Sequence, residues 1–174
     1  MTDATSTGLL AGAKGAWQLD PKRTTIEIHT KAMWGIAKVK GTFSAVSGGG
    51  VVGDQGVSGE LVVDAGSINT KNNKRDAHLR SADFFDVDTY PTLTFTASEA
   101  TASLDGSLKI KGTLRIKDQS RPIELNAAVT SLTPDRATVQ AETTLDRSQW
   151  GMSWAKLGAR LVNRVVIAAE FVRA

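Results

Sequence analysis

The chain has 174 residues, a length typical of one domain, and its composition (41% hydrophobic, 22% charged, 6% aromatic) is that of an ordinary globular protein. It contains no cysteine and two histidines, which excludes disulfide scaffolds, cysteine-based zinc sites, iron–sulfur clusters and thiol nucleophiles. The net charge of +3 permits attraction to anionic membranes or nucleic acid without requiring either.

The first residues are predicted to form a tail. Residues 1–14 are rich in Thr, Ser, Ala and Gly without periodicity, so they lack the apolar surface that offsets the entropy of ordering. We expect residues 1–14 to be disordered and residues 15–174 to form one domain. The apolar stretch at residues 8–13 is short and no basic residue precedes it, which makes a poor signal peptide. We therefore expect a mature chain that starts near Met1, and a cytoplasmic protein.

From Trp17 onward, apolar and polar residues alternate with a period of two, the pattern of half-buried antiparallel strands. The predicted strands cover residues 26–29, 37–43, 60–65, 93–97, 108–117, 123–129, 137–146 and 161–172. Turn-forming residues separate them at positions 20–22, 48–56, 105–106, 117–122 and 133–135. About eight such strands predict a closed barrel or a sandwich, and only a barrel leaves no exposed edge. A barrel of eight strands encloses either a side-chain core or one small ligand.

Residues 72–81 break the alternation and predict a short helix. Asn72 is a candidate N-cap, β-branched residues are absent, and Asp76 stands four residues before Arg80 for an intrahelical ion pair. Phe84 and Phe85 follow outside any regular alternation and predict an apolar plug or lip at one barrel end. The polar residues of the helix are expected mainly to tie it to the barrel: Arg75, Asp76, His78 and Arg80.

The motifs of common catalytic sites are missing. The chain has no G-x-S-x-G elbow, and the glycine-rich residues 47–53 lack the Lys-Ser/Thr pair of a phosphate-binding loop, so a hairpin loop is the better interpretation. His78 has the acidic neighbours Asp76 and Asp83, which ordinary ion pairs explain better than a metal does. We therefore expect neither a catalytic residue nor a metal site.

Basic residues share the outward side of two predicted strands. They are Lys38, Lys40, Lys109, Lys111, Arg115 and Lys117. This pattern favours a solvated face that resists aggregation, with transient contact to an anionic membrane as the alternative. Aromatic residues do not interleave with these charges, as nucleic-acid binding would require, so no nucleic-acid partner is expected.

Small side chains dominate the inward positions. They are Ala37, Gly41, Ala65, Ala97, Gly112, Ala127, Ala141 and Ala169. Such residues predict a hollow bore, and a hollow apolar tube suits a lipid tail. Aromatic and methionine residues near the strand ends are the candidate contacts, although Phe43 and Phe95 suit a dry core equally well.

The segment from residue 67 to residue 86, with RDAHLRSADFFD at its end, resembles a family signature, and YPTLTF follows it at residues 90–95. Further matches are WQLDP at 17–21, VKGTF at 39–43, GTLRI at 112–116, RPI at 121–123, and DR at 146–147 before WGM at 150–152. Residues 16–174 thereby resemble the YceI-like family of polyisoprenoid-binding, lipocalin-like barrels. The resemblance implies an all-β fold: an eight-stranded antiparallel lipocalin-like β-barrel with a short helical insertion. It also implies a long isoprenoid chain, quinone-like or polyprenyl, or another amphiphile in the bore.

Residues and resemblance together predict a non-catalytic carrier that transports such a lipid, needs no cofactor other than the bound lipid, and is free to form a homodimer. The expected ligand-binding residues are Met33, Trp34, Ile36, Phe43, His78, Leu79, Arg80, Phe84, Phe85, Phe95, Trp150, Met152 and Trp154. Two alternatives stay open. One is an enzyme that uses His78, Asp76 and Arg80 for acid–base chemistry and anion holding. The other is a partner-binding scaffold with a filled core.

Overall fold

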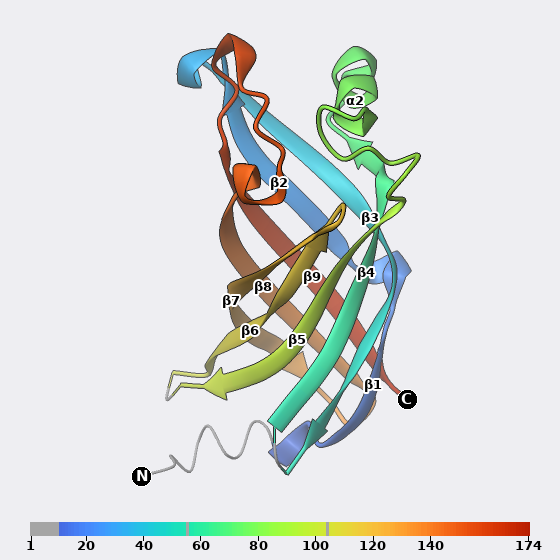
Figure 1. Cartoon of the computed structure of the whole chain (residues 1–174). Helices are drawn as coiled ribbons and strands as arrows, with labels where there is room; N and C mark the ends of the chain where they lie inside the picture. The colour runs from blue at the N-terminus through green and yellow to red at the C-terminus, as the bar shows by residue number, and fades with distance from the viewer. Residues whose placement is uncertain (1–10, 55, 104) are drawn as a thin grey trace.

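The fold is a closed antiparallel β-barrel, shown in Figure 1 as a computed structural model that describes residues 11–54, 56–103 and 105–174. Nine strands follow the order β1-β3-β2-β9-β8-β7-β6-β5-β4, and pairing of β3 with β4 closes the sheet. The strands are β1 (Gly15–Leu19), β2 (Thr25–Ala32), β3 (Ala37–Gly53), β4 (Gly56–Asn69), β5 (Thr92–Ala102), β6 (Ser107–Ile116), β7 (Gln119–Leu132), β8 (Arg136–Asp146) and β9 (Val162–Arg173). Because β1 and β2 both lie between β3 and β9, they share one position, and the barrel is eight-stranded as predicted.

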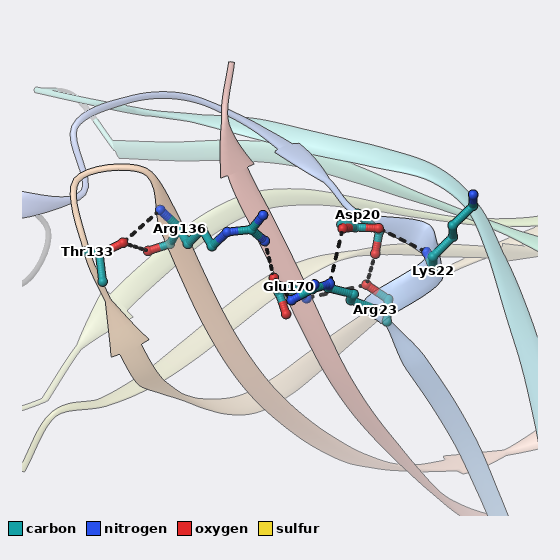
Figure 2. A network of polar contacts seen from close by, with 7 residues as sticks. Asp20, Lys22, Arg23, Thr133, Arg136 and Glu170 are labelled. Atoms are coloured by element: carbon teal, nitrogen blue, oxygen red, sulfur yellow. Dashed lines mark hydrogen bonds and ion pairs between the residues drawn. The ribbon is translucent and has the colours of Figure 1, made fainter.

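A polar network holds the junction between β1 and β2, where the 3-10 helix η1 (Pro21–Arg23) interrupts the strand (Figure 2). The Asp20 carboxylate accepts a hydrogen bond from the Lys22 amide at 3.1 Å, and the Asp20 amide donates to the Glu170 carbonyl at 2.8 Å. The Glu170 carboxylate accepts hydrogen bonds from Arg23 and Arg136. These contacts join the interrupted strand to β9 and β8 on the outside of the barrel.

The glycines of β3 correct one prediction. Residues 48–50 do not form a loop; they lie inside β3, which pairs there with both β1 and β4 and turns only after Gly53. A Cβ atom on Gly49 would lie 2.5 Å from the Trp17 carbonyl oxygen, and one on Gly50 would lie 2.5 Å from the Ser58 carbonyl oxygen. Glycine is needed here for close approach of neighbouring backbones rather than for a turn.

Another predicted turn is shorter than expected. The connection assigned to residues 117–122 is a tight hairpin, because Ile116 pairs with Gln119 and β7 begins at that residue. Lys117 adopts a φ of 59°, as the first residue of such a two-residue turn requires. The predicted turns at residues 105–106 and 133–135 are confirmed between β5 and β6 and between β7 and β8.

The helix prediction is confirmed. Helix α2 covers Asn73–Arg80, and the Asn72 side chain caps it by accepting a hydrogen bond from the Arg75 amide at 3.0 Å. In Figure 1, α2 stands at the end of the barrel that also carries the loops with η2 (Met33–Gly35) and η4 (Lys156–Gly158). We call this end the mouth.

The predicted tail lies mostly outside the described residues, since residues 1–10 are not among them. The next residues contact the barrel. The Ala13 carbonyl accepts a hydrogen bond from the Trp17 indole at 2.7 Å, and the Lys14 carbonyl accepts one from Arg173.

Two apolar clusters fill the barrel at different heights. The larger cluster lies toward the mouth and contains the buried residues Ile26, Phe43, Val63, Ala65, Ile68, Phe84, Phe85, Leu93, Ile116, Trp150 and Met152. The smaller cluster contains Leu108, Leu125, Ala127 and Ala141 and closes the bore below. A ligand entering from the mouth therefore meets a packed floor.

We predict that Gly112→Ala destabilises the fold, because the new Cβ would lie 2.2 Å from the Thr96 carbonyl oxygen and 2.8 Å from the Phe95 ring. Overpacking of this kind costs about 1–3 kcal/mol, which lowers Tm by several degrees. Gly53→Ala is the control, because its Cβ has no neighbour closer than 3.8 Å. Equal melting curves for the two variants would contradict the prediction.

Candidate functional site

The barrel contains an apolar cavity of about 670 Å³ that extends from the floor to the mouth. Strands β2 to β9 all contribute to its wall, and α2 and the η4 loop border it at the mouth. Inward alternate positions supply the apolar wall: Ile26 and Ile28, Val39 and Phe43, Leu61 and Val63, Leu93 and Phe95, Leu114 and Ile116, Ile123 and Leu125, and Val165 and Ile167. A site of this size and character suits one small apolar ligand.

The barrel contains an apolar cavity, as the prediction of a hollow bore requires, but most of the small inward residues on which that prediction was based do not line it. Of the eight, Ala37 and Gly41 line the cavity. Ala127 and Ala141 instead belong to the floor cluster, where they lie opposite each other on the neighbouring strands β7 and β8. Larger aliphatic side chains line the cavity instead, among them Ile28, Leu61 and Leu114.

Ten of the thirteen predicted ligand-binding residues line the cavity. They are Met33, Phe43, His78, Leu79, Phe84, Phe85, Phe95, Trp150, Met152 and Trp154. The other three do not. Trp34 and Ile36 point into solvent, with 78% and 82% of their surfaces exposed. The Arg80 guanidinium donates to the carbonyls of Gly66 and Ile68, both at 2.9 Å, and is absent from the wall.

An aromatic group stands at one side of the mouth. The ring of His78 contacts Phe84 and Trp154 edge-on, with centroid distances of 5.1 and 4.6 Å. The guanidinium of Arg147 lies 5.2 Å from the centre of the Phe84 ring. Phe85 packs edge-on against Phe43 at 5.4 Å. Both adjacent phenylalanines are therefore buried core residues as well as part of the cavity wall, and neither is a free lip.

Buried polar contacts anchor α2 to the end of β4. The Asp76 carboxylate, 4% exposed, accepts hydrogen bonds from the Thr70 amide at 2.9 Å and the Thr70 hydroxyl at 2.5 Å. Arg75 donates to the Thr70 hydroxyl and carbonyl. The predicted Asp76–Arg80 ion pair does not form, because both side chains face β4 and find partners there. The expectation that these residues tie the helix to the barrel fits this geometry.

His78 forms one ion-pair contact, with its Nε2 2.9 Å from the Asp83 carboxylate. Within residues 11–54, 56–103 and 105–174, no three His, Asp or Glu side chains are grouped so as to hold a metal ion. No helix in that part of the chain is long and apolar enough to cross a membrane.

Cations at the mouth were missed from the sequence. The basic residues that line the cavity are Lys31, Lys74, Arg75, Arg147, Lys156 and Arg160, and no carboxylate of the described residues lines it. A sequence signal was available, because residues 28–53 and 147–169 contain neither Asp nor Glu. Strand alternation indicated instead the basic residues on the outer faces of β3 and β6.

Arg147 is a partly buried member of this group. Its Nε donates to the Arg160 carbonyl at 3.2 Å and its Nη1 to the Met152 carbonyl at 2.6 Å. Its Nη2 is buried and has no hydrogen-bond partner among the described residues. Burial lowers the pKa of the Arg147 guanidinium from its ordinary value, and the neighbouring Asp146 carboxylate opposes that shift.

A family model described as a YceI-like domain matches residues 17–172. The chain belongs to the YceI-like family. A UPF0312 protein of Pectobacterium carotovorum is 28% identical to it over 177 residues, which cover 97% of this chain and 91% of that protein. A UPF0312 protein of Vibrio cholerae is 34% identical over 96 residues, 53% of this YceI-like chain and 51% of that protein. The chain thus matches about half the length of the Vibrio relative.

Solved structures share the barrel of this YceI-like chain. Burkholderia cenocepacia BcnA superposes with a TM-score of 0.72 at 18% identity, over 90% of this chain and 99% of BcnA. A polyisoprenoid binding domain from Saccharophagus degradans superposes with a TM-score of 0.70 at 17% identity, over 92% and 100%. The Campylobacter jejuni YCEI protein superposes with a TM-score of 0.68 at 25% identity, over 80% and 87%. These neighbours establish the fold.

We predict that Asp76→Ala destabilises this YceI-like protein, because it leaves the buried Thr70 amide without an acceptor. The loss of charge-assisted hydrogen bonds, which leaves a buried donor unpaired, lowers the free energy of unfolding by about 1.5–3 kcal/mol. Thermal melting followed by circular dichroism measures the loss. Asp83→Ala is the control, because the side chain of Asp83 is 58% exposed and its pair with His78 is worth at most about 1 kcal/mol. A larger loss for Asp83→Ala would contradict this account of the helix anchor.

Proposed function

We propose that this protein is a carrier that holds the tail of an isoprenoid, quinone-like or polyprenyl, or of another long-chain amphiphile in its bore. The observation that carries the proposal is the apolar cavity of about 670 Å³, open at the mouth and floored by packed side chains. Its volume falls within the range of about 300–1,000 Å³ typical of small-molecule sites. The name of the Saccharophagus degradans domain, which describes polyisoprenoid binding, supports the same ligand class.

Burial of a tail supplies the binding free energy. Each methylene removed from water contributes roughly 0.8 kcal/mol, so ten carbons contribute about 8 kcal/mol before the cost of association. The wall offers few polar groups below the mouth, so tail length governs affinity more than specific hydrogen bonds do. A carrier that releases its ligand to a membrane or a partner benefits from such a non-directional attraction.

The enzyme alternative has less support. Of its three named groups, Asp76 accepts bonds from Thr70 and Arg80 donates to two carbonyls of β4. His78 alone reaches the cavity, and its Nε2 contacts Asp83. Acid–base catalysis would require a second group positioned near the substrate. The partner-binding scaffold has less support as well, because it requires a filled core and does not account for the cavity.

We predict that Val165→Phe lowers affinity for a long-chain prenol about tenfold or more, because the larger side chain occupies volume in the bore where the tail would lie. Quenching of tryptophan emission on titration with geranylgeraniol measures the affinity, since Trp150 and Trp154 line the same cavity. The purified protein is also expected to release an apolar compound into organic solvent.

Val166→Phe is the matched control, because Val166 is the next residue of β9 and does not line this cavity. We expect it to bind like the wild type, and melting curves verify that both variants fold. Equal binding by both variants would place the ligand outside the bore. Failure of any long-chain apolar compound to bind below about 100 μM would overturn the carrier proposal.

A further inference from the structure

The hairpin of β2 and β3 ends in an exposed apolar turn. Residues 33–36 connect the two strands and include three large apolar residues, Met33, Trp34 and Ile36, which we call the tip. Their surfaces are 53%, 78% and 82% exposed. Six large apolar residues are exposed among those whose side chains the structure describes, so half of them lie within these four positions. Exposed apolar surface gathered in this way marks an interaction site.

The tip has a strained backbone and packs on a second loop. Met33 and Trp34 adopt left-handed φ values of 51° and 56°, a conformation that side chains other than glycine rarely occupy. The Trp34 ring lies against the η4 loop, since a Cβ on Gly158 would lie 2.9 Å from two carbons of that ring. Strain of this kind persists where the surrounding structure enforces it, and it is typical of functional segments.

Like charges lie opposite each other beside the tip. Lys31 and Lys38 are partners in the β2–β3 register, and like charges at opposite positions destabilise an antiparallel pair. Further from the tip, the same two strands carry a compensating carboxylate, because Glu27 lies 3.1 Å from the ammonium group of Lys40. The charge next to the tip therefore favours a partner that supplies negative charge.

The two segments that build this side of the mouth are strongly basic. Residues 28–53 and 147–169 together contain seven lysines and arginines and neither Asp nor Glu. Asp146, just before the second segment, caps η3 with its side chain. The side of the mouth with α2 differs, because the turns after that helix carry the exposed residues Asp83 and Asp88. The surface complementary to the tip and its surroundings is therefore apolar and anionic.

We propose that the tip inserts into the interface of an anionic bilayer, with Lys31 and Lys38 among the lipid headgroups. Tryptophan and aliphatic side chains beside lysines suit this place, because the apolar groups enter the acyl boundary while the ammonium groups contact phosphates. A protein partner fits less well, since a stable interface uses about 20–30 residues a side and the tip offers three. A second copy would bring like charges together.

Insertion of the tip would bring the mouth to the membrane. The tip stands at the same barrel end as the η4 loop (Figure 1). Met33 belongs to both surfaces, because it is exposed and also lines the cavity. Lys31 and Arg160 line the cavity as well, and the Arg160 amide donates to the Lys31 carbonyl at 3.1 Å. A lipid that leaves the bilayer at the tip therefore enters the bore directly. This last step rests on the proposed carrier function, whereas docking itself does not.

Flotation with vesicles measures docking. Wild-type protein is expected to float with vesicles of phosphatidylcholine and phosphatidylglycerol, and less with phosphatidylcholine alone. Trp34→Ser with Ile36→Ser is expected to weaken partitioning about ten- to a hundredfold, because two apolar side chains no longer enter the interface. Val46→Ser with Val51→Ser, two exposed valines of β3 outside the tip, is the control and is expected to float like the wild type. Melting curves verify that both variants fold.

The lysines beside the tip are tested separately. Lys31→Gln with Lys38→Gln is expected to remove most of the preference for phosphatidylglycerol, and salt is expected to do the same to the wild type. Lys109→Gln with Lys111→Gln is the control, on the outer face of β6 beside Glu124. A larger loss in that control would assign docking to the strand face and overturn the role of the tip.

Trp34 also reports insertion directly. Trp17 and Trp150 are buried, whereas Trp34 is exposed, so vesicles with brominated acyl chains are expected to quench Trp34 emission. Trp34→Phe keeps an apolar tip and is expected to float, with much weaker quenching than the wild type. Equal quenching of Trp34→Phe and wild type would place the bromine contacts elsewhere and overturn insertion of the tip.

The remaining outcomes separate docking from the carrier function. Unchanged flotation of the Trp34→Ser and Ile36→Ser variant would overturn docking by the tip. Dimerisation without vesicles that this variant abolishes would assign the tip to a second copy and likewise overturn it. A protein that binds geranylgeraniol in solution but does not float would leave the carrier standing and overturn docking. A protein that floats through its tip but binds no long-chain compound would support docking and overturn the carrier.

Discussion

Closure of one strongly coiled sheet is the constraint on which the rest of this molecule depends. The long strand β3 pairs with β2 near the mouth, with β1 near the opposite end and with β4 where the barrel closes. Such a path requires register shifts and glycines where backbones nearly touch. Packed side chains fill one part of the closed barrel, and the part toward the mouth encloses the cavity.

The cavity wall follows from strand alternation, and the charged mouth follows from the segments that border the barrel end. Alternation places aliphatic side chains inside wherever a strand runs through the barrel wall, whatever the strand's neighbours are. At the mouth, the end of β2, helix α2, η3 and the η4 loop carry the lysines and arginines that line the cavity. An apolar cavity with a cationic rim is complementary to an amphiphile, because the tail and the head of such a ligand would each contact a matching surface.

Helix α2 contributes to this arrangement because hydrogen bonds to the end of β4 fix its position. Thr70, at the end of β4, satisfies both Asp76 and Arg75, so the helix presents His78 and Leu79 to the cavity. The aromatic contacts among His78, Phe84 and Trp154 then join the helix side of the mouth to the η3–η4 segment. One buried carboxylate thereby supports one side of the site.

The sequence by itself determined the strands, their inward faces, the helix with its Asn72 cap and the family, because alternation, capping and motif spacing are local properties. It also determined most of the apolar wall. Only the tertiary structure decided which inward residues lie around open space, because that depends on how far apart opposite strands stand. For the same reason, Arg147 and Lys156 line the cavity whereas Trp34, Ile36 and Arg80 do not. Loop residues acquire their neighbours from the folding of distant segments, and no periodicity along the chain encodes those contacts.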